Sequence, residues 1–150
     1  MSDAVIVLNA GSSSLKFSIY AVDDPELVLK ARGQIEGLGS TPRFKARNQD
    51  ERILAEFMIE EPARDFGHPE AFVLLAEWIR KQFSQELSPV AVGHRIAHGG
   101  SEFAEPVVVD ESVIAQLEKL IPLVPLHQPH NLAAIRAVAK LRPDIPQVAC

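Results

Sequence analysis

The chain has 150 residues, 47% of them hydrophobic and 23% charged, so it can bury a sizeable core as one domain or a large part of one. Its net charge of -5 and its isoelectric point near 5.5 argue against nucleic-acid binding, and no apolar run is long enough for a membrane span. A single cysteine, Cys150, and an N-terminus without a secretory signal predict a cytoplasmic protein with no intrachain disulfide.

The first part of the chain is rich in short β-prone runs. Residues 5–8 and 15–20 flank the turn-forming letters NAGSSS, a pattern typical of a β-hairpin. Residues 27–35 predict a further strand, and RFKAR and RILAEFMIE predict a second hairpin around NQDE. No helical pattern separates these runs, so we expect an antiparallel meander rather than βαβ units.

Helical periodicity begins at GHPEAFVLLAEWIRKQFSQEL. Its apolar residues recur at helical spacing, and Pro69 suits the first turn; the residues concerned are Phe72, Leu75, Ile79 and Phe83. The stretch leads into SPVAVGHRIAHGG, which predicts a buried strand that ends in a glycine pair.

Two more helices and two short strands are predicted towards the end of the chain. Residues 107–109 are extended, and Asp110 is a good N-cap for ESVIAQLEKLI. Asn131 can cap LAAIRAVAKL, which stops before Pro143, and IPQVAC begins a strand. The predicted fold class is therefore α/β, a mixed sheet with flanking helices. Because ligands gather at the carboxyl ends of strands and the sequence stops inside one, we interpret residues 1–150 as the N-terminal part of a longer protein.

The segment LNAGSSSLKF, residues 8–17, is the first candidate for chemistry. Its glycine permits a tight turn, its backbone N–H groups and hydroxyls can cup a phosphate, and Lys16 adds a positive charge. The spacing is not that of a P-loop, which excludes that mechanism. An ordinary polar hairpin turn is the alternative.

The segment GHRIAHGG, residues 93–100, is the second candidate. Strand alternation sends Arg95 and Ala97 to one face of the sheet, and His94 and His98 to the other. An arginine at the end of a strand can grip a carboxylate or phosphate with two parallel hydrogen bonds. A metal site is disfavoured, because a His-x-x-x-His spacing suits a helix rather than a strand. The alternative is a structural salt bridge and hydrogen-bonded core histidines.

The segment PLHQPHN, residues 125–131, is the third candidate. Pro125 and Pro129 restrict the backbone around Leu126 and His127 in a connector between two predicted helices. A histidine held beside an arginine is useful where charge develops in a transition state. The alternatives are an incidental surface residue for His127 and a surface or first-turn residue for His130.

Together, VLNAGSSSLKFSIY, VGHRIAHGG and PLHQPHNL resemble three signatures of the acetate kinase family, in order and spacing, over about residues 4–150. The resemblance implies the N-terminal lobe of the two-lobed fold shared with sugar kinases, the Hsp70 ATPase and actin. It also implies reversible transfer of the γ-phosphoryl group of ATP to acetate, giving acetyl phosphate and ADP. Mg²⁺ is the implied metal, and a homodimer is expected at full length. Without the nucleotide-binding lobe, and without a family segment resembling FDTAFH that would follow Cys150, this piece is expected to be inactive.

The resemblance assigns roles to four residues of the first segment. Asn9 matches an asparagine near the phosphates and Mg²⁺. Ser12 and Ser14 match serines that handle the nucleotide phosphates or the metal. Lys16 is also in place, with a less defined role.

The resemblance also assigns a transfer point and an acyl pocket. Arg95 matches the arginine that binds the carboxylate and steadies the transferring phosphoryl group, and His127 matches the histidine that hydrogen-bonds it in the transition state. Ala97 and Leu126 match residues that line the pocket for the acetate methyl group. The family usually has valine at the position of Ala97, so we expect propionate to be accepted more readily than by a typical acetate kinase. A propionate or butyrate kinase, a non-enzymatic actin-like or Hsp70-like nucleotide-binding lobe, and a plain structural α/β domain remain alternatives.

Overall fold

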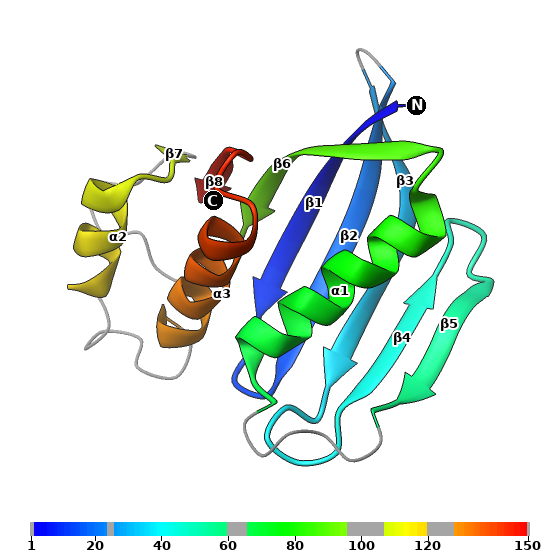
Figure 1. Ribbon diagram of the computed structural model, residues 1–150, viewed down its shortest axis with the longest axis horizontal. Coiled ribbons are helices and arrows are strands. Elements are labelled where there is room, and N and C mark those ends of the chain that lie inside the picture. The colour runs from blue at the N-terminus through cyan, green and yellow to red at the C-terminus, as the bar shows by residue number, and fades with distance from the viewer. Residues whose placement is uncertain (1, 24–25, 60–65, 96–106, 120–127, 150) are drawn as a thin grey trace.

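One mixed β-sheet organises the chain in the computed structural model, which describes residues 2–23, 26–59, 66–95, 107–119 and 128–149 (Figure 1). Within these residues the sheet has eight strands, in the spatial order β5-β4-β3-β2-β1-β6-β8-β7. The first five strands are antiparallel neighbours in chain order: β1 Ser2–Ala10, β2 Ser14–Asp23, β3 Glu26–Glu36, β4 Arg43–Arg47 and β5 Ile53–Met58. The predicted meander of two hairpins is confirmed.

The second half of the sheet is built around parallel pairing. Strand β6, Leu87–His94, runs parallel to β1, and β8, Gln147–Ala149, runs parallel to β6. The short strand β7, Val107–Val108, closes this edge in antiparallel pairing with β8. The predicted α/β class with a mixed sheet is confirmed. The carboxyl ends of β1, β6 and β8 consequently meet at one end of the sheet.

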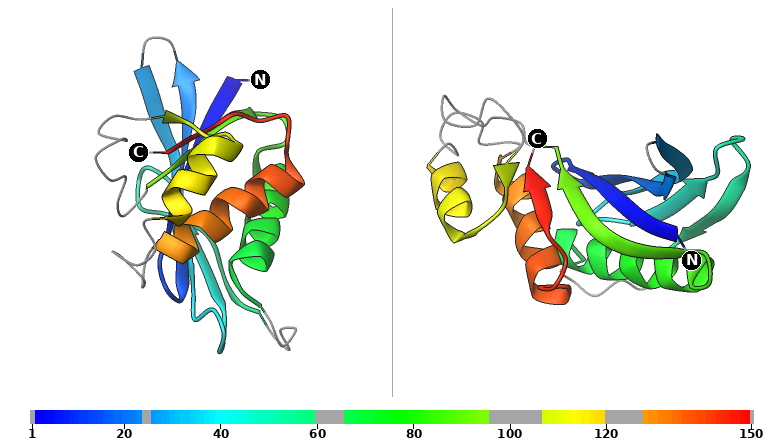
Figure 2. Two further views of the ribbon diagram at one scale, coloured as in Figure 1. Left: turned by 90° about the vertical axis from the view of Figure 1, so that its left-hand side faces the viewer. Right: turned by 90° about the horizontal axis from the view of Figure 1, so that it is seen from above.

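Helices cover one face of the sheet. Helix α1, His68–Phe83, and helix α3, Gln128–Leu141, pack against each other and against that face, and α2, Glu111–Glu118, packs on α3 (Figure 2). The four apolar residues whose spacing predicted α1 are all buried, but the helix ends at Phe83 and Leu87 already belongs to β6. None of the helices in these parts of the chain combines the length and apolar character needed to cross a membrane.

The beginning of α3 corrects one prediction. Asn131 was expected to cap this helix, yet α3 begins three residues earlier, and Asn131 is a buried first-turn residue with 3% of its surface exposed. Pro129 explains the difference, because a proline at the second position of a helix has a suitable φ and lacks an N–H that the helix would leave unpaired there. The predicted connector PLHQPHN therefore ends inside a helix. By contrast, the predicted cap of α2 is confirmed, since the Asp110 carboxylate accepts a hydrogen bond from the N–H of Val113 at 2.8 Å.

The core lies between the sheet and the helices. Alternate residues of β1 and β2, among them Leu8 and Ile19, are fully buried and face Leu75 of α1 and its neighbours. On β3, the chain passes so close to its neighbours that Gly33 has no room for a side chain. A methyl group there would lie 2.1 Å from the carbonyl oxygen of Lys45 and 2.7 Å from the ring of Phe17.

Replacing Gly33 with alanine is expected to destabilise the fold by roughly 1–3 kcal/mol or more, because the closest atom is a backbone oxygen that cannot rotate away. Gly93→Ala is the matched control, since a methyl group there would meet only Val7, at an ordinary 3.9 Å. The measurement is the midpoint of thermal unfolding of both variants and the wild type. Equal midpoints for the two variants would contradict the packing around Gly33.

Candidate active site

The first candidate segment forms the end of β1, a tight turn, and the start of β2. The N–H of Gly11 donates to the carbonyl oxygen of Ser14 at 2.9 Å, which closes the turn. A methyl group on Gly11 would lie 2.8 Å from the Ser14 hydroxyl oxygen, so glycine allows the close approach of these two residues. The Ser12 side chain is exposed, and the N–H of Leu38 donates to the carbonyl oxygen of Ser13 at 3.0 Å. The turn thus presents hydroxyl groups to the outside while its backbone is held from within.

Polar side chains at the ends of three neighbouring strands form a row, in which Arg95 directly follows the last residue of β6. Asn9 of β1 pairs with Lys16 of β2. On the other side of β1, Leu8 pairs with His94, and the N–H of Arg95 donates to the carbonyl oxygen of Leu8 at 3.0 Å. Because residues alternate between faces, the row of Lys16, Asn9 and Arg95 lies on the face opposite the helices. The structure therefore brings together five of the predicted site residues, the two serines of the turn included.

The charge of this face suits an anion. Lys16 and Arg95 are both exposed and carry positive charge beside the amide of Asn9. Lys16 also borders a shallow polar hollow of about 420 Å³ over β2, β3 and β4, in which Arg32 and Arg47 form ion pairs with Glu51. In the described ranges, no three His, Cys, Asp or Glu residues are grouped as a metal site would need. Lysine, arginine, amide and hydroxyl groups at one place are the donors that bind phosphate and carboxylate.

His94 is a hydrogen-bonded core residue, one of the alternatives that the sequence left open. Its side chain points to the helical face, is 2% exposed, and donates from Nε2 to Gln147 Oε1 at 2.5 Å. Gln147 in turn donates to the carbonyl oxygen of Ile135 in α3 at 3.2 Å. Burial disfavours the imidazolium form and lowers the pKa of His94 to about 4, although the hydrogen bond to Gln147 works in the opposite direction. A neutral His94 thus ties the end of β6 to β8 and α3, and this fixes the strand that carries Arg95.

His68 was missed by the sequence analysis. It is the first residue of α1 and is 7% exposed, and its Nε2 lies 2.7 Å from the carbonyl oxygen of Gly11 and 3.2 Å from that of Ser14. Its ring stacks on that of His130, with centroids 5.0 Å apart. No local pattern predicts this, because the residues that His68 contacts are more than fifty positions away in the sequence. His130 lies in the first turn of α3, as one of its alternatives expected.

The remaining predicted site residues lie outside the described part of the chain. These are Ala97, Leu126 and His127. Their roles stay predictions from the sequence.

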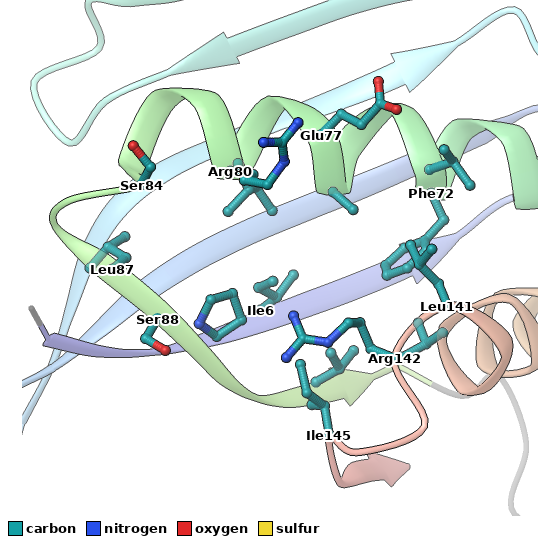
Figure 3. A pocket seen from close by; sticks show the side chains of 16 residues that line it. Ile6, Phe72, Glu77, Arg80, Ser84, Leu87, Ser88, Leu141, Arg142 and Ile145 are labelled. Carbon is teal, nitrogen blue, oxygen red and sulfur yellow. The ribbon is translucent and has the colours of Figure 1, made fainter.

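The cavity of about 390 Å³ beneath α1 lies away from this site (Figure 3). Its lining is mainly apolar, with Ile6, Phe72 and Leu141, and it reaches Leu87 at the start of β6 and Ile145 just before β8. It therefore borders the amino ends of the parallel strands, whereas ligands of open α/β sheets bind at the carboxyl ends. The row of Lys16, Asn9 and Arg95 is the better candidate site.

A mixed sheet with a glycine–serine turn and a row of lysine, asparagine and arginine at the carboxyl ends of its parallel strands defines an α/β domain whose donors suit phosphate or carboxylate ligands. The chain belongs to the acetokinase family, whose model matches residues 4–150. This confirms the resemblance found in the sequence.

Individual relatives agree with the family. The chain is 40% identical to the acetate kinase of Nitrobacter hamburgensis and 44% identical to that of Rhodopseudomonas palustris. These matches cover 99% and 100% of this chain but only 36% and 37% of the relatives, so the chain spans just over a third of their length.

Two solved structures share the fold. The propionate kinase of Francisella tularensis matches with a TM-score of 0.82 and 27% identity, over 99% of this chain and 36% of that one. The acetate kinase of Porphyromonas gingivalis matches with a TM-score of 0.81 and 32% identity, over 99% of this chain and 37% of that one. The described strands and helices therefore have the arrangement of an acyl kinase over about a third of such a protein.

Burial of neutral His94 makes stability depend on pH. Its pKa of about 4 in the folded protein lies below the 6.5 of an ordinary histidine, so the unfolded state binds more protons between these values and stability falls as the pH drops. Below pH 4 the free energy of unfolding is lower than at pH 7 by about 3 kcal/mol from this histidine alone. We expect thermal unfolding midpoints measured from pH 7 to 4.5 to fall more steeply for the wild type than for His94→Asn, which cannot titrate. Parallel curves would contradict a buried neutral His94.

Proposed function

We propose that the protein containing this chain is an acetate kinase, which transfers the γ-phosphoryl group of ATP reversibly to the carboxylate of acetate and so forms acetyl phosphate and ADP. The observation that carries the proposal is the row of Lys16, Asn9 and Arg95 beside the glycine–serine turn, in a chain of the acetokinase family. Two relatives at 40% and 44% identity bear the same name. Residues 1–150 serve as the N-terminal lobe and are inactive alone, because they span just over a third of such a protein.

The chemistry requires positioning more than proton transfer. Acetate is already deprotonated at neutral pH, so its attack on phosphorus needs no general base. Catalysis then depends on alignment of the two substrates and on positive charge around the transferring phosphoryl group. In this mechanism Asn9, the turn hydroxyls of Ser12 and Ser14, and Lys16 bind the nucleotide phosphates. Arg95 binds the acetate carboxylate and an equatorial oxygen of the phosphoryl group.

This lobe offers few oxygen donors for Mg²⁺, so they fit an ion that is held jointly by the protein, the substrate phosphates and water. Magnesium in phosphate sites keeps several waters and is held by few protein oxygens together with the substrate phosphates. In the described residues the lobe offers the amide oxygen of Asn9 and the serine hydroxyls at the turn. Asn9 is therefore the proposed ligand from this lobe, and the bound ion would neutralise charge on the β- and γ-phosphates.

The other roles at the transfer point are proposed from the sequence alone. His127 donates a hydrogen bond to the phosphoryl group in the transition state, and Ala97 and Leu126 line the pocket for the methyl group. The protein acts in the cytoplasm and works as a homodimer at full length. The lone cysteine, Cys150, agrees with a reducing compartment.

A propionate kinase is the second candidate. One observation favours it: Ala97 stands where the family usually has valine, which leaves more room for the longer acyl chain. The fold also matches a propionate kinase and an acetate kinase about equally well. The two candidates therefore differ only in the length of the acyl chain.

The proposal is tested by acyl phosphate formation from ATP and acetate, trapped with hydroxylamine, in the full-length protein and in residues 1–150 alone. Activity in the full-length protein only is the expected result. Activity in the short chain would contradict the assignment of this lobe, and inactivity of both would favour the non-enzymatic nucleotide-binding alternative.

Arg95→Ala and His127→Ala are each expected to reduce turnover of the full-length protein at least about a hundredfold, because losing one donor to a transition-state oxygen costs about 3–4 kcal/mol. Arg52→Ala is the control, since it removes an exposed arginine between β4 and β5 that belongs neither to the row nor to the lining of the hollow beside Lys16. Unfolding midpoints establish that the variants fold. Near wild-type turnover of Arg95→Ala would remove that residue from the mechanism.

Ala97→Val is expected to shift the ratio of kcat/KM values towards acetate and away from propionate by roughly tenfold or more, since one methylene group in an apolar pocket changes discrimination by about 1–3 kcal/mol. The ratio is measured in the wild type and the variant by the same hydroxylamine assay. An unchanged ratio would show that residue 97 does not line the acyl pocket.

A further inference from the structure

We infer that His68 is a positioning residue for the nucleotide phosphates: its imidazole holds the β1–β2 turn from the inner side, so that the turn's N–H and hydroxyl groups face the ligand. This inference rests on the proposed function, because it assigns the turn to phosphate binding. His68 is placed to touch neither substrate nor metal, and it acts through the backbone of the turn.

The contacts of His68 identify the ring nitrogen that donates. Both of its near neighbours are carbonyl oxygens, that of Gly11 at 2.7 Å and that of Ser14 at 3.2 Å. A carbonyl oxygen can only accept, so Nε2 must carry a hydrogen and donate. The side chain is 7% exposed, so little water competes for this bond. Helix α1 is thereby attached to both ends of the turn through one nitrogen.

Fixing the Gly11 carbonyl also fixes the next N–H. The peptide unit between Gly11 and Ser12 is planar and trans, so its C=O and N–H groups point in opposite directions. Because the C=O points inward to His68, the N–H of Ser12 points away from His68, towards the open side of the turn. Oriented backbone N–H groups of this kind bind phosphate well when they are held in place before the ligand arrives.

A second contact fixes the His68 ring itself. It stacks on the ring of His130 with centroids 5.0 Å apart and an interplanar angle of 27°. His130 lies in the first turn of α3, three positions after His127 in the sequence. The stack therefore connects the turn that binds nucleotide phosphates to the helix that directly follows the predicted transfer histidine.

Two substitutions in the full-length protein separate the contacts. His68→Phe keeps a ring against His130 but has no donor for the carbonyl oxygens. His68→Gln loses the ring but places an amide N–H near the position of Nε2. If the turn depends on the donor, the phenylalanine variant raises the KM for MgATP and the dissociation constant for MgADP by about tenfold or more, with the KM for acetate little changed. The glutamine variant restores most of this loss, because its amide N–H donates to the same carbonyl oxygens.

The readouts are steady-state kinetics, calorimetric binding of MgADP, and unfolding midpoints. Wild-type MgADP affinity in His68→Phe overturns the inference. The inference is also overturned if His68→Phe raises the KM values for MgATP and acetate equally and lowers the unfolding midpoint, and if His68→Gln does not restore them. That pattern describes a purely structural residue. If His68→Phe fails to fold, His68→Asn makes the same test, since its amide is too short to reach the carbonyl oxygens.

The same measurements separate this inference from the proposed function. A wild-type protein that binds MgADP but forms no acyl phosphate refutes the acetate kinase proposal alone, and the binding data still test His68. A wild-type protein that binds no MgADP overturns both.

Discussion

The parallel register between β1 and β6 is the constraint on which the candidate site depends. It places Leu8 beside His94, and the hydrogen bond from Arg95 to Leu8 continues the pairing one residue further. Asn9 and Arg95 therefore meet although most of the meander and all of α1 separate them in the sequence. A shift of one residue would turn Arg95 towards the helices and bury its charge, since side chains alternate between the faces of a sheet. The apolar residues of β1 that face the helices keep this register in place.

The two faces of the sheet carry different kinds of residue at this end. On the helical face, His94 is buried, neutral and bonded to Gln147, which in turn holds α3. On the opposite face, the next residue, Arg95, is exposed beside Asn9. The last residue of β6 thus anchors the strand, and the residue that follows it carries the charge that the proposed function assigns to the acyl carboxylate. Helices α1 and α3 cover one face, and Lys16, Asn9 and Arg95 lie on the other.

The β1–β2 turn is held by hydrogen bonds from residues outside it. Glycine and serine are flexible residues, and a turn built from them loses entropy when it is ordered. Here the N–H of Leu38 and the imidazole of His68 bind the carbonyl oxygens of Ser13, Gly11 and Ser14. If the turn binds phosphate as we propose, ordering it in advance lowers the cost of binding.

The sequence by itself determined what local patterns and short signatures encode. Alternation and turn chemistry gave the meander, helical spacing gave the buried side of α1, the carboxylate of Asp110 gave the start of α2, and three short motifs identified the family. It failed at Asn131, where a capping residue competed with Pro129 and the proline set the start of α3. Only the tertiary structure decided that Asn9 and Arg95 stand side by side, that His94 is an anchor, and that His68 holds the turn. The reason is physical: such contacts join residues far apart in the chain, and their partners are chosen by the packing of the sheet against the helices rather than by neighbours in sequence.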